Sequence, residues 1–164
     1  MSNKRLVLYT VSAGAFLALT PQDSAWAQET AYEVRGCGVN EASVIDKAGD
    51  MTIATSVTRG NADLVRPGMP AIKFTYECRA VSNFSKDGAE FSNRCTFVDP
   101  DGDRLVGASN GTQKGWQWRY LGGTGKWSGI AGGGPGVPDG AYSRMSPSVA
   151  GSCYKATGTY TLKK

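Results

Sequence analysis

The chain has 164 residues, a formal net charge of +4 and no histidine. Without histidine, Ser-His-Asp and Cys-His catalysis are excluded, and the commonest metal ligand of proteins is missing. The small positive charge comes without a block of lysines and arginines, so it favours solubility over nucleic-acid binding, even though the aromatic segment "WQWRY" at residues 116–120 has the composition of a base-stacking platform.

The first 27 residues have the order of a secretory signal peptide. Lys4 and Arg5 precede an apolar run over residues 6–19, and Ala25-Trp26-Ala27 supplies the small-x-small cleavage pattern. The run is shorter than the ~20 residues of a spanning helix, and a retained membrane anchor is the alternative. We expect cleavage after Ala27, export to the periplasm or the extracellular space, and a mature single domain over residues 28–164 with no membrane span.

Short alternating segments separated by turns make up the mature chain. In "AIKFTYECRAV" at residues 71–81, the apolar residues Ile72, Phe74 and Tyr76 share one face, and "GWQWRYL" at residues 115–121 alternates in the same way. Further strands are expected at residues 32–39, 51–60, 94–98, 104–106, 126–131 and 157–164, and a turn of helix is expected within residues 39–50. Many short strands with turn residues between them predict an all-β sandwich or barrel.

The glycine-rich stretch "GGTGKWSGIAGGGP" at residues 122–135 resembles a phosphate-binding loop only at first sight. A Walker-type loop around Gly125-Lys126 requires glycine at Tyr120 and serine or threonine at Trp127, and a dinucleotide fingerprint requires glycine at Ser128. Both motifs also open a helix, which glycine and proline prevent here. We interpret the stretch as a hairpin turn over residues 122–125 followed by a strand, with Gly129 at a bulge or barrel corner.

Three aspartates in "VDPDGDRLVG" imitate the start of a calcium loop. Asp99, Asp101 and Asp103 have the right spacing, but Arg104 and Asn110 stand where an EF-hand needs glycine and glutamate. The better interpretation is a hairpin whose turn is Asp101-Gly102 and whose aspartates bond backbone groups and stay solvated, with a weak calcium site as the alternative. No metal or cofactor is therefore expected.

The segments "CTFVDPDGDRLVG", "GWQWRYLGGTGKWSGIAGGG" and "GTYTLKK" resemble bacterial exported proteins of the allene oxide cyclase-like barrel superfamily, which includes plant allene oxide cyclases and dirigent proteins. The resemblance covers about residues 74–164. It implies a closed antiparallel barrel of about eight strands that can assemble as a homo-trimer. Plant allene oxide cyclases guide ring closure of a reactive fatty-acid epoxide, and dirigent proteins steer the coupling of phenolic radicals. Their catalytic residues do not map onto positions of this chain.

A small barrel holds either packed side chains or one small ligand. The residues expected to line an apolar pocket for such a ligand are Trp116, Trp118, Tyr120, Phe74, Tyr76 and Phe97. The alternative is that they form the core or an interface between subunits. Glu77 and Arg79 share a strand face and are the candidate catalytic pair, as a buried acid beside a cation, or else a solvated pair on the outer wall. The sequence thus predicts a barrel that binds a small apolar or aromatic molecule, with a cofactor-free cyclase or isomerase as the alternative function.

Four cysteines in an exported chain favour two disulfides, with three possible connectivities. We expect Cys78 to pair with Cys95, because a single loop joins their strands. We expect Cys37 to pair with Cys153, because the first and last strands are neighbours when a barrel closes.

Overall fold

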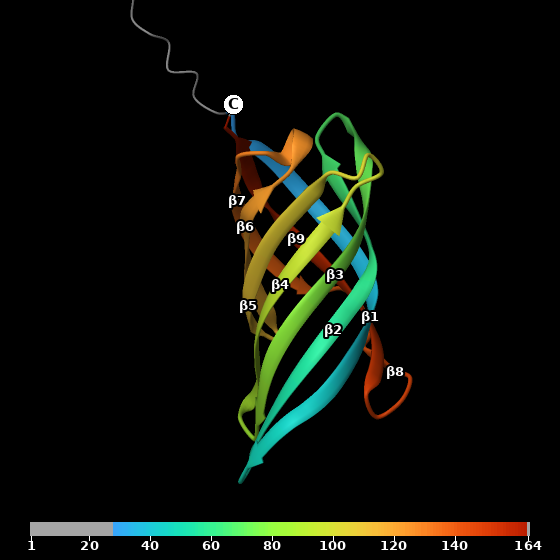
Figure 1. The fold of residues 1–164 in the computed structure, drawn as a ribbon, viewed down its shortest axis with the longest axis vertical. Helices are drawn as coiled ribbons and strands as arrows, with labels where there is room; N and C mark the ends of the chain where they lie inside the picture. The colour runs from blue at the N-terminus through green and yellow to red at the C-terminus, as the bar shows by residue number, and fades with distance from the viewer. Residues whose placement is uncertain (1–27, 164) are drawn as a thin grey trace, which may run out of the picture.

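A computed structural model describes residues 28–163, which form a closed antiparallel barrel of eight strands (Figure 1). The barrel strands are β1 (Thr30–Ala48), β2 (Met51–Arg66), β3 (Met69–Ser85), β4 (Gly88–Val98), β5 (Arg104–Thr112), β6 (Gly115–Gly123), β7 (Ile130–Pro138) and β9 (Val149–Leu162). A one-turn 3-10 helix, η1 (Gly125–Trp127), and a two-residue strand, β8 (Ser143–Arg144), complete the described elements. The predicted all-β barrel is confirmed. The predicted signal peptide, residues 1–27, lies outside the described residues.

From β2 to β7 each strand pairs with its predecessor, β7 then pairs with β9, and β1 closes the barrel against β9. This last pairing runs from Thr30 opposite Tyr160 to Glu41 opposite Val149. The pairing of β7 with β9 ends at Pro138. The first residues of β9 pair with β8 instead, with Ser143 opposite Gly151. Because the sheet closes on itself, its strands satisfy one another's backbone groups around the whole circumference.

The strands differ in length, and this makes the two ends of the barrel unlike. β1, β2 and β3 have 19, 16 and 17 residues, whereas β5, β6 and β7 have 9 each. The long strands extend past the short ones at the end that carries the β1–β2 and β3–β4 hairpins, at the bottom of Figure 1. We call this the open end. The opposite end, where β9 finishes, is the closed end.

An apolar plug fills the closed end. Its buried members come from seven strands and η1: Tyr32, Leu64, Phe74, Leu105, Tyr120, Trp127, Ile130 and Tyr160. Trp127 is 2% exposed, and its ring lies 5.7 Å from that of Phe74 and 6.1 Å from that of Tyr160, measured between centroids. The 3-10 turn therefore carries the tryptophan that caps the barrel.

Two sequence expectations about local structure are wrong, one at each end of the barrel. Residues 39–50 do not form a turn of helix, because β1 continues to Ala48 and pairs with β2 almost to the hairpin. The glycine-rich stretch gives a 3-10 turn at residues 125–127 rather than a strand from Lys126, and its strand runs from Ile130 to Pro138. Gly129 lies between the two with φ +71°, a conformation that suits glycine and agrees with the corner expected there.

Asp99 anchors the 3-10 turn from the neighbouring loop. Its carboxylate accepts hydrogen bonds from Trp127 Nε1 (2.9 Å) and from the backbone amides of Asp101 (2.9 Å) and Asp103 (3.1 Å), and Lys126 Nζ lies 2.8 Å away. The predicted hairpin with its Asp101-Gly102 turn is confirmed. The expectation that its aspartates are all solvated is wrong for Asp99, whose side chain is fully buried because η1 folds over it.

Burial raises the pKa of Asp99, but the bonds from Lys126, Trp127 and the two backbone amides outweigh burial and hold the pKa below its usual value of 3.8. The carboxylates of Asp101 and Asp99 in turn raise the pKa of Lys126 to about 12. The plug is therefore fastened by a charged group that is ionised at neutral pH.

Both predicted disulfides are present. Cys37 bonds Cys153 across the β1–β9 closure, and Cys78 bonds Cys95 across β3 and β4. The first lies on the outer wall, where Cys37 is exposed, and the second faces the lumen, where Cys95 is 4% exposed. Two disulfides are typical of proteins that fold in an oxidising compartment.

The two disulfides should differ in their contribution to stability. Their sequence separations are 116 and 17, and the chain-entropy relation gives the longer loop about 1.7 kcal/mol more stabilisation. We expect the double variant Cys37→Ala/Cys153→Ala to lose more unfolding free energy in urea than Cys78→Ala/Cys95→Ala. Equal losses, or a larger loss for the second variant, would contradict a role of the first disulfide in barrel closure.

Asn in place of Asp99 should cost about 1.5–3 kcal/mol at pH 7, because the bonds to a charged acceptor are lost. A carboxyl group whose pKa is lowered by folding stabilises the fold above its usual pKa, and this contribution disappears as the pH falls through the folded-state value. The difference in unfolding free energy between wild type and Asp99→Asn should therefore shrink below about pH 4. Asp101→Asn is the matched control, because its exposed ion pair contributes at most about 1 kcal/mol. A difference that does not change between pH 7 and pH 3 would refute this assignment.

Candidate functional site

Below the plug, the lumen is a cavity of about 1140 Å³ that opens at the open end. Its walls are the inward residues of all eight barrel strands, from the underside of the plug to the hairpins. Val44, Phe84 and Tyr142 stand at its mouth with exposed fractions of 58%, 40% and 64%. The cavity is at the upper end of the size range of ligand pockets, and its entrance is apolar.

Aromatic rings form the inner part of this cavity. Tyr76 and Phe97 lie 5.3 Å apart between ring centroids, and Phe97 meets Trp118 edge-on at 5.6 Å. On the other side, Tyr154 meets Tyr76 at 5.9 Å and Trp116 at 6.3 Å. The rings touch one another around the lumen and leave the space below them open.

Glycines in the strands make room for these rings. A Cβ atom on any of four glycines would come within 2.0–2.6 Å of an aromatic side chain: Gly36 beside Tyr154, Gly38 beside Tyr76, Gly107 beside Trp118 and Gly136 beside Trp116. Real Cβ atoms do not approach so closely. Each of these aromatic side chains therefore occupies the space that a Cβ atom would take at the glycine, so a larger residue there would force the side chain further into the lumen.

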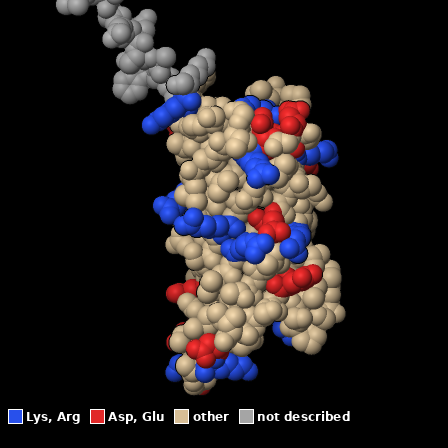
Figure 2. Space-filling view, in the orientation of Figure 1, with Lys and Arg blue, Asp and Glu red and all other residues tan. Residues whose placement is uncertain are grey.

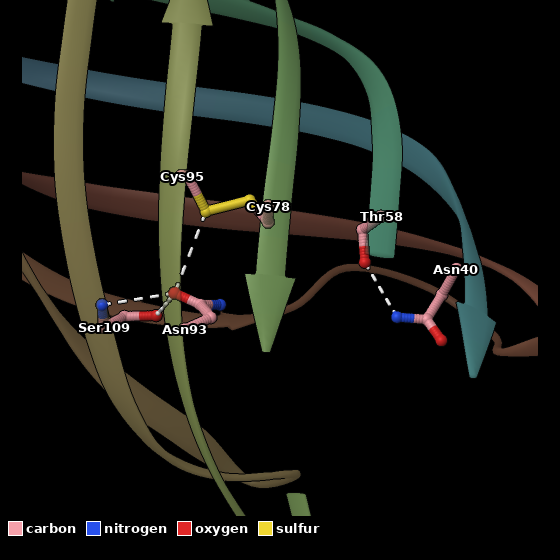
Figure 3. Close-up of a disulfide and its surroundings, with 6 residues drawn as sticks. All are labelled: Asn40, Thr58, Cys78, Asn93, Cys95 and Ser109. Carbon is pink, nitrogen blue, oxygen red and sulfur yellow. Dashed lines mark hydrogen bonds between the residues drawn. A yellow bond between two sulfur atoms is a disulfide. The ribbon is translucent and has the colours of Figure 1, made fainter. Parts of the chain in front are cut away.

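Three amide side chains line the cavity, those of Asn40, Asn93 and Gln113, and the two asparagines lie near the lumen-facing disulfide (Figure 3). Asn93 Oδ1 accepts hydrogen bonds from the backbone N–H (3.2 Å) and the hydroxyl (2.8 Å) of Ser109, and lies 3.8 Å from Cys95 Sγ. On β1, Asn40 Nδ2 donates to Thr58 Oγ1 at 2.8 Å. The cavity thus offers neutral hydrogen-bonding groups at defined places.

Charge is almost absent from the cavity wall. Among its described lining residues, the charged side chains are Glu90 and Arg144, both at exposed positions near the mouth.

Burial raises the pKa of Tyr76 to about 12, and burial together with Tyr76 raises the pKa of Tyr154 further. These phenols stay protonated at neutral pH, so they donate hydrogen bonds and do not act as bases. Tyr154 Oη is buried and has no partner among the described residues.

All six aromatic residues that the sequence singled out face the interior of the barrel. Phe74 and Tyr120 belong to the plug, and the other four line the open part of the lumen: Tyr76, Phe97, Trp116 and Trp118. They serve as core and cavity wall together, so core packing and pocket lining were not exclusive alternatives.

Glu77 and Arg79 lie outside the lumen. On β3 the inward positions are even-numbered, because Phe74, Tyr76 and Cys78 face the cavity, and the odd-numbered residues between them face solvent. Glu77 pairs with Arg59 Nε at 2.9 Å and with Arg79 at 2.8 Å on the outer wall, where Lys, Arg, Asp and Glu side chains gather (Figure 2). Their geometry is that of the solvated pair, and it gives them no contact with a molecule in the lumen.

Sequence reasoning missed Asn93, Ser109 and Tyr154. Asn93 has a signal in the chain, because it alternates with Phe91, Cys95 and Phe97 and must share their face. Ser109 and Tyr154 have none, since small and aromatic residues in glycine-rich strands do not show which side they take.

Within residues 28–163, no three or more cysteine and acidic side chains are grouped to hold a metal ion. The same residues contain no helix that is long and apolar enough to cross a membrane.

No protein-family model matches the chain, and no curated protein matches it in sequence. Among solved structures, it is similar to a dirigent protein that is a pterocarpan synthase, with 12% identity, 90% of this chain and 100% of that chain covered, and a TM-score of 0.49. The strand pairing of the chain itself defines its fold class.

Gly107→Ala should disturb the lumen directly. The added Cβ would lie 2.0 Å from the Trp118 ring, so the ring must turn into the cavity at a cost of about 1–3 kcal/mol. We expect a lower melting temperature and a shifted tryptophan emission. Gly151→Ala is the matched control, because its new Cβ would meet only the flexible end of Met145 at 3.1 Å. Similar effects of the two substitutions would show that Gly107 makes no special room for the ring.

Proposed function

We propose that the protein is an exported barrel that binds a small apolar or aromatic molecule in the open part of its lumen. The observation that carries this is the cavity of about 1140 Å³, closed at one end by the plug, walled by Tyr76, Phe97, Trp116 and Trp118, and open at the other. A soluble barrel that needed only stability would gain by filling this space, because each unfilled volume loses packing contacts.

Export is supported by two independent features. The start of the chain has the basic, apolar and Ala-x-Ala order of a signal peptide, and the two disulfides suit an oxidising compartment. The resemblance of residues 74–164 to exported barrels of the allene oxide cyclase-like superfamily points in the same direction.

A second candidate function is a cyclase or isomerase that works by holding a reactive substrate in one conformation. The observation that favours it is the rigid aromatic wall, with rings in mutual contact around one side of the cavity. Described groups deep in the lumen are neutral amides, hydroxyls and phenols, so such catalysis would rest on confinement and orientation rather than on proton transfer.

Titration with 2-naphthol and with a medium-chain fatty acid tests the binding proposal. Trp116 and Trp118 line the cavity, so a bound ligand should quench or shift the tryptophan fluorescence. Trp118→Ala should weaken binding by about 1.5–3 kcal/mol, the value of one large apolar contact. Arg79→Ala, on the outer wall, is the control and should leave the affinity unchanged.

The stability of each variant must be measured beside its affinity, because loss of a packed tryptophan costs about 3–5 kcal/mol of folding free energy. Circular dichroism separates unfolding from loss of binding. A folded protein whose fluorescence responds to neither ligand, nor to other small apolar molecules, would refute the proposed function.

A further inference from the structure

The orientation of the Asn93 amide is fixed by its neighbour. The backbone N–H of Ser109 can only donate, and it lies 3.2 Å from Asn93 Oδ1, so the oxygen of the amide must face Ser109. The Ser109 hydroxyl donates to the same oxygen at 2.8 Å. Because the oxygen is held on the β5 side, the NH₂ group points away from Ser109, as Figure 3 shows.

This NH₂ group is a donor that the barrel does not use. Among the described residues it has no hydrogen-bond partner, while the oxygen of the same amide accepts two bonds. Asn93 lines the cavity, and its neighbours along β4 on the inner face are Phe91 and the disulfide-bonded Cys95. Ser109 is buried, and its partner across β5 and β6 is Trp118. The free donor is therefore set among apolar and aromatic surfaces.

Asn40, the other amide near the lumen-facing disulfide, is different. Its NH₂ group already donates to Thr58 at 2.8 Å. The hydroxyl groups of Tyr76 and Tyr154 are further donors in the lumen, and Tyr154 Oη has no partner among the described residues. The polar groups of the inner lumen thus present donors to a ligand, with that of Asn93 the most firmly oriented.

The ligand's matching group must be uncharged. The charged side chains among the described lining residues are Glu90 and Arg144, both near the mouth, so nothing at the depth of Asn93 compensates a carboxylate. Transfer of an unpaired charge into an apolar site is far more costly than transfer of a neutral carbonyl that gains a hydrogen bond.

We propose that Asn93, oriented by Ser109, determines the specificity of the lumen by donating a hydrogen bond from Nδ2 to a neutral oxygen, such as a ketone or ether oxygen, of an aromatic ligand. This inference rests on the proposed function and names the chemical class of its ligand. Asn93 is a binding residue here, and Ser109 is a positioning residue that acts through it.

Three naphthalenes of nearly the same shape test the proposal: 2-acetylnaphthalene, 2-ethylnaphthalene and 2-naphthoate. The first has a neutral carbonyl, the second lacks it, and the third replaces it with a carboxylate. Their dissociation constants are measured by calorimetry on the wild type, Asn93→Leu and Asn40→Leu. Because each variant is compared with itself across ligands, general losses of packing cancel in the ratio of the constants.

We expect the preference for the ketone over the ethyl compound to fall about three- to tenfold in Asn93→Leu, the range of one hydrogen bond. In Asn40→Leu it should stay within about twofold, because that amide is already bonded to Thr58. The wild type should bind 2-naphthoate at least about tenfold more weakly than the ketone.

Each other outcome overturns a defined statement. If the wild type binds none of the three compounds, the proposed function fails together with this inference. If it binds them but Asn93→Leu keeps the wild-type preference, or Asn40→Leu loses it equally, the inference fails and the proposed function stands. Tight binding of 2-naphthoate overturns the neutral ligand class.

A second variant covers the case in which Asn93→Leu does not fold. Measured at pH 8, where the carboxyl group is ionised, Asn93→Asp keeps an oxygen acceptor for both bonds from Ser109 and replaces the NH₂ donor with a second, negatively charged acceptor oxygen. It should lose the ketone preference as Asn93→Leu does, with a circular dichroism spectrum like that of the wild type. A folded Asn93→Asp that retains the preference also refutes the proposal.

Discussion

Closure of the sheet by the pairing of β1 with β9 is the constraint on which the other features depend. Once the first and last strands are joined, every barrel strand has one face toward a common interior. This parity, meaning which alternate residues of a strand point inward and which point outward, is then fixed for each strand. The Cys37–Cys153 disulfide lies on this seam. Parity in turn places Asn93 and Trp118 inside and Glu77 outside, which separates the chemistry of the lumen from the charged outer wall.

Within the closed barrel, packing is divided unequally along the axis. At the closed end, large residues meet across the lumen and exclude space, and the buried Asp99 holds Trp127 over them. Further down, glycines lie beside the aromatic side chains of the wall, as Gly107 lies beside Trp118. Aromatic residues thus form a solid core at the closed end and the wall of a cavity further down, and the glycines decide where the change occurs.

Local alternation was enough to predict the strands that carry Tyr76 and Trp118. The single loop between two strands was enough to predict Cys78–Cys95, and the closure of a barrel was enough to predict Cys37–Cys153. Local alternation was not enough to predict β7, because its glycines and prolines have no preference for a strand and the strand depends on its pairing with β6 and β9. Asp99 was missed as a buried group because its partner Trp127 is 28 residues away along the chain. The donor on Asn93 depends on a bond across two strands, which no periodicity reveals.

The unequal strands also decide which part of a guest molecule the barrel can inspect. On one side, β1 to β3 continue well beyond the ends of β5 to β7, so the mouth is cut at a slant and is walled on one side only. A molecule that enters head first is surrounded at its leading end and lies against a single surface at its trailing end. The shape of the barrel would therefore select ligands by the group that enters first and would accept trailing chains of different length. Related compounds with the same leading group would bind at one site.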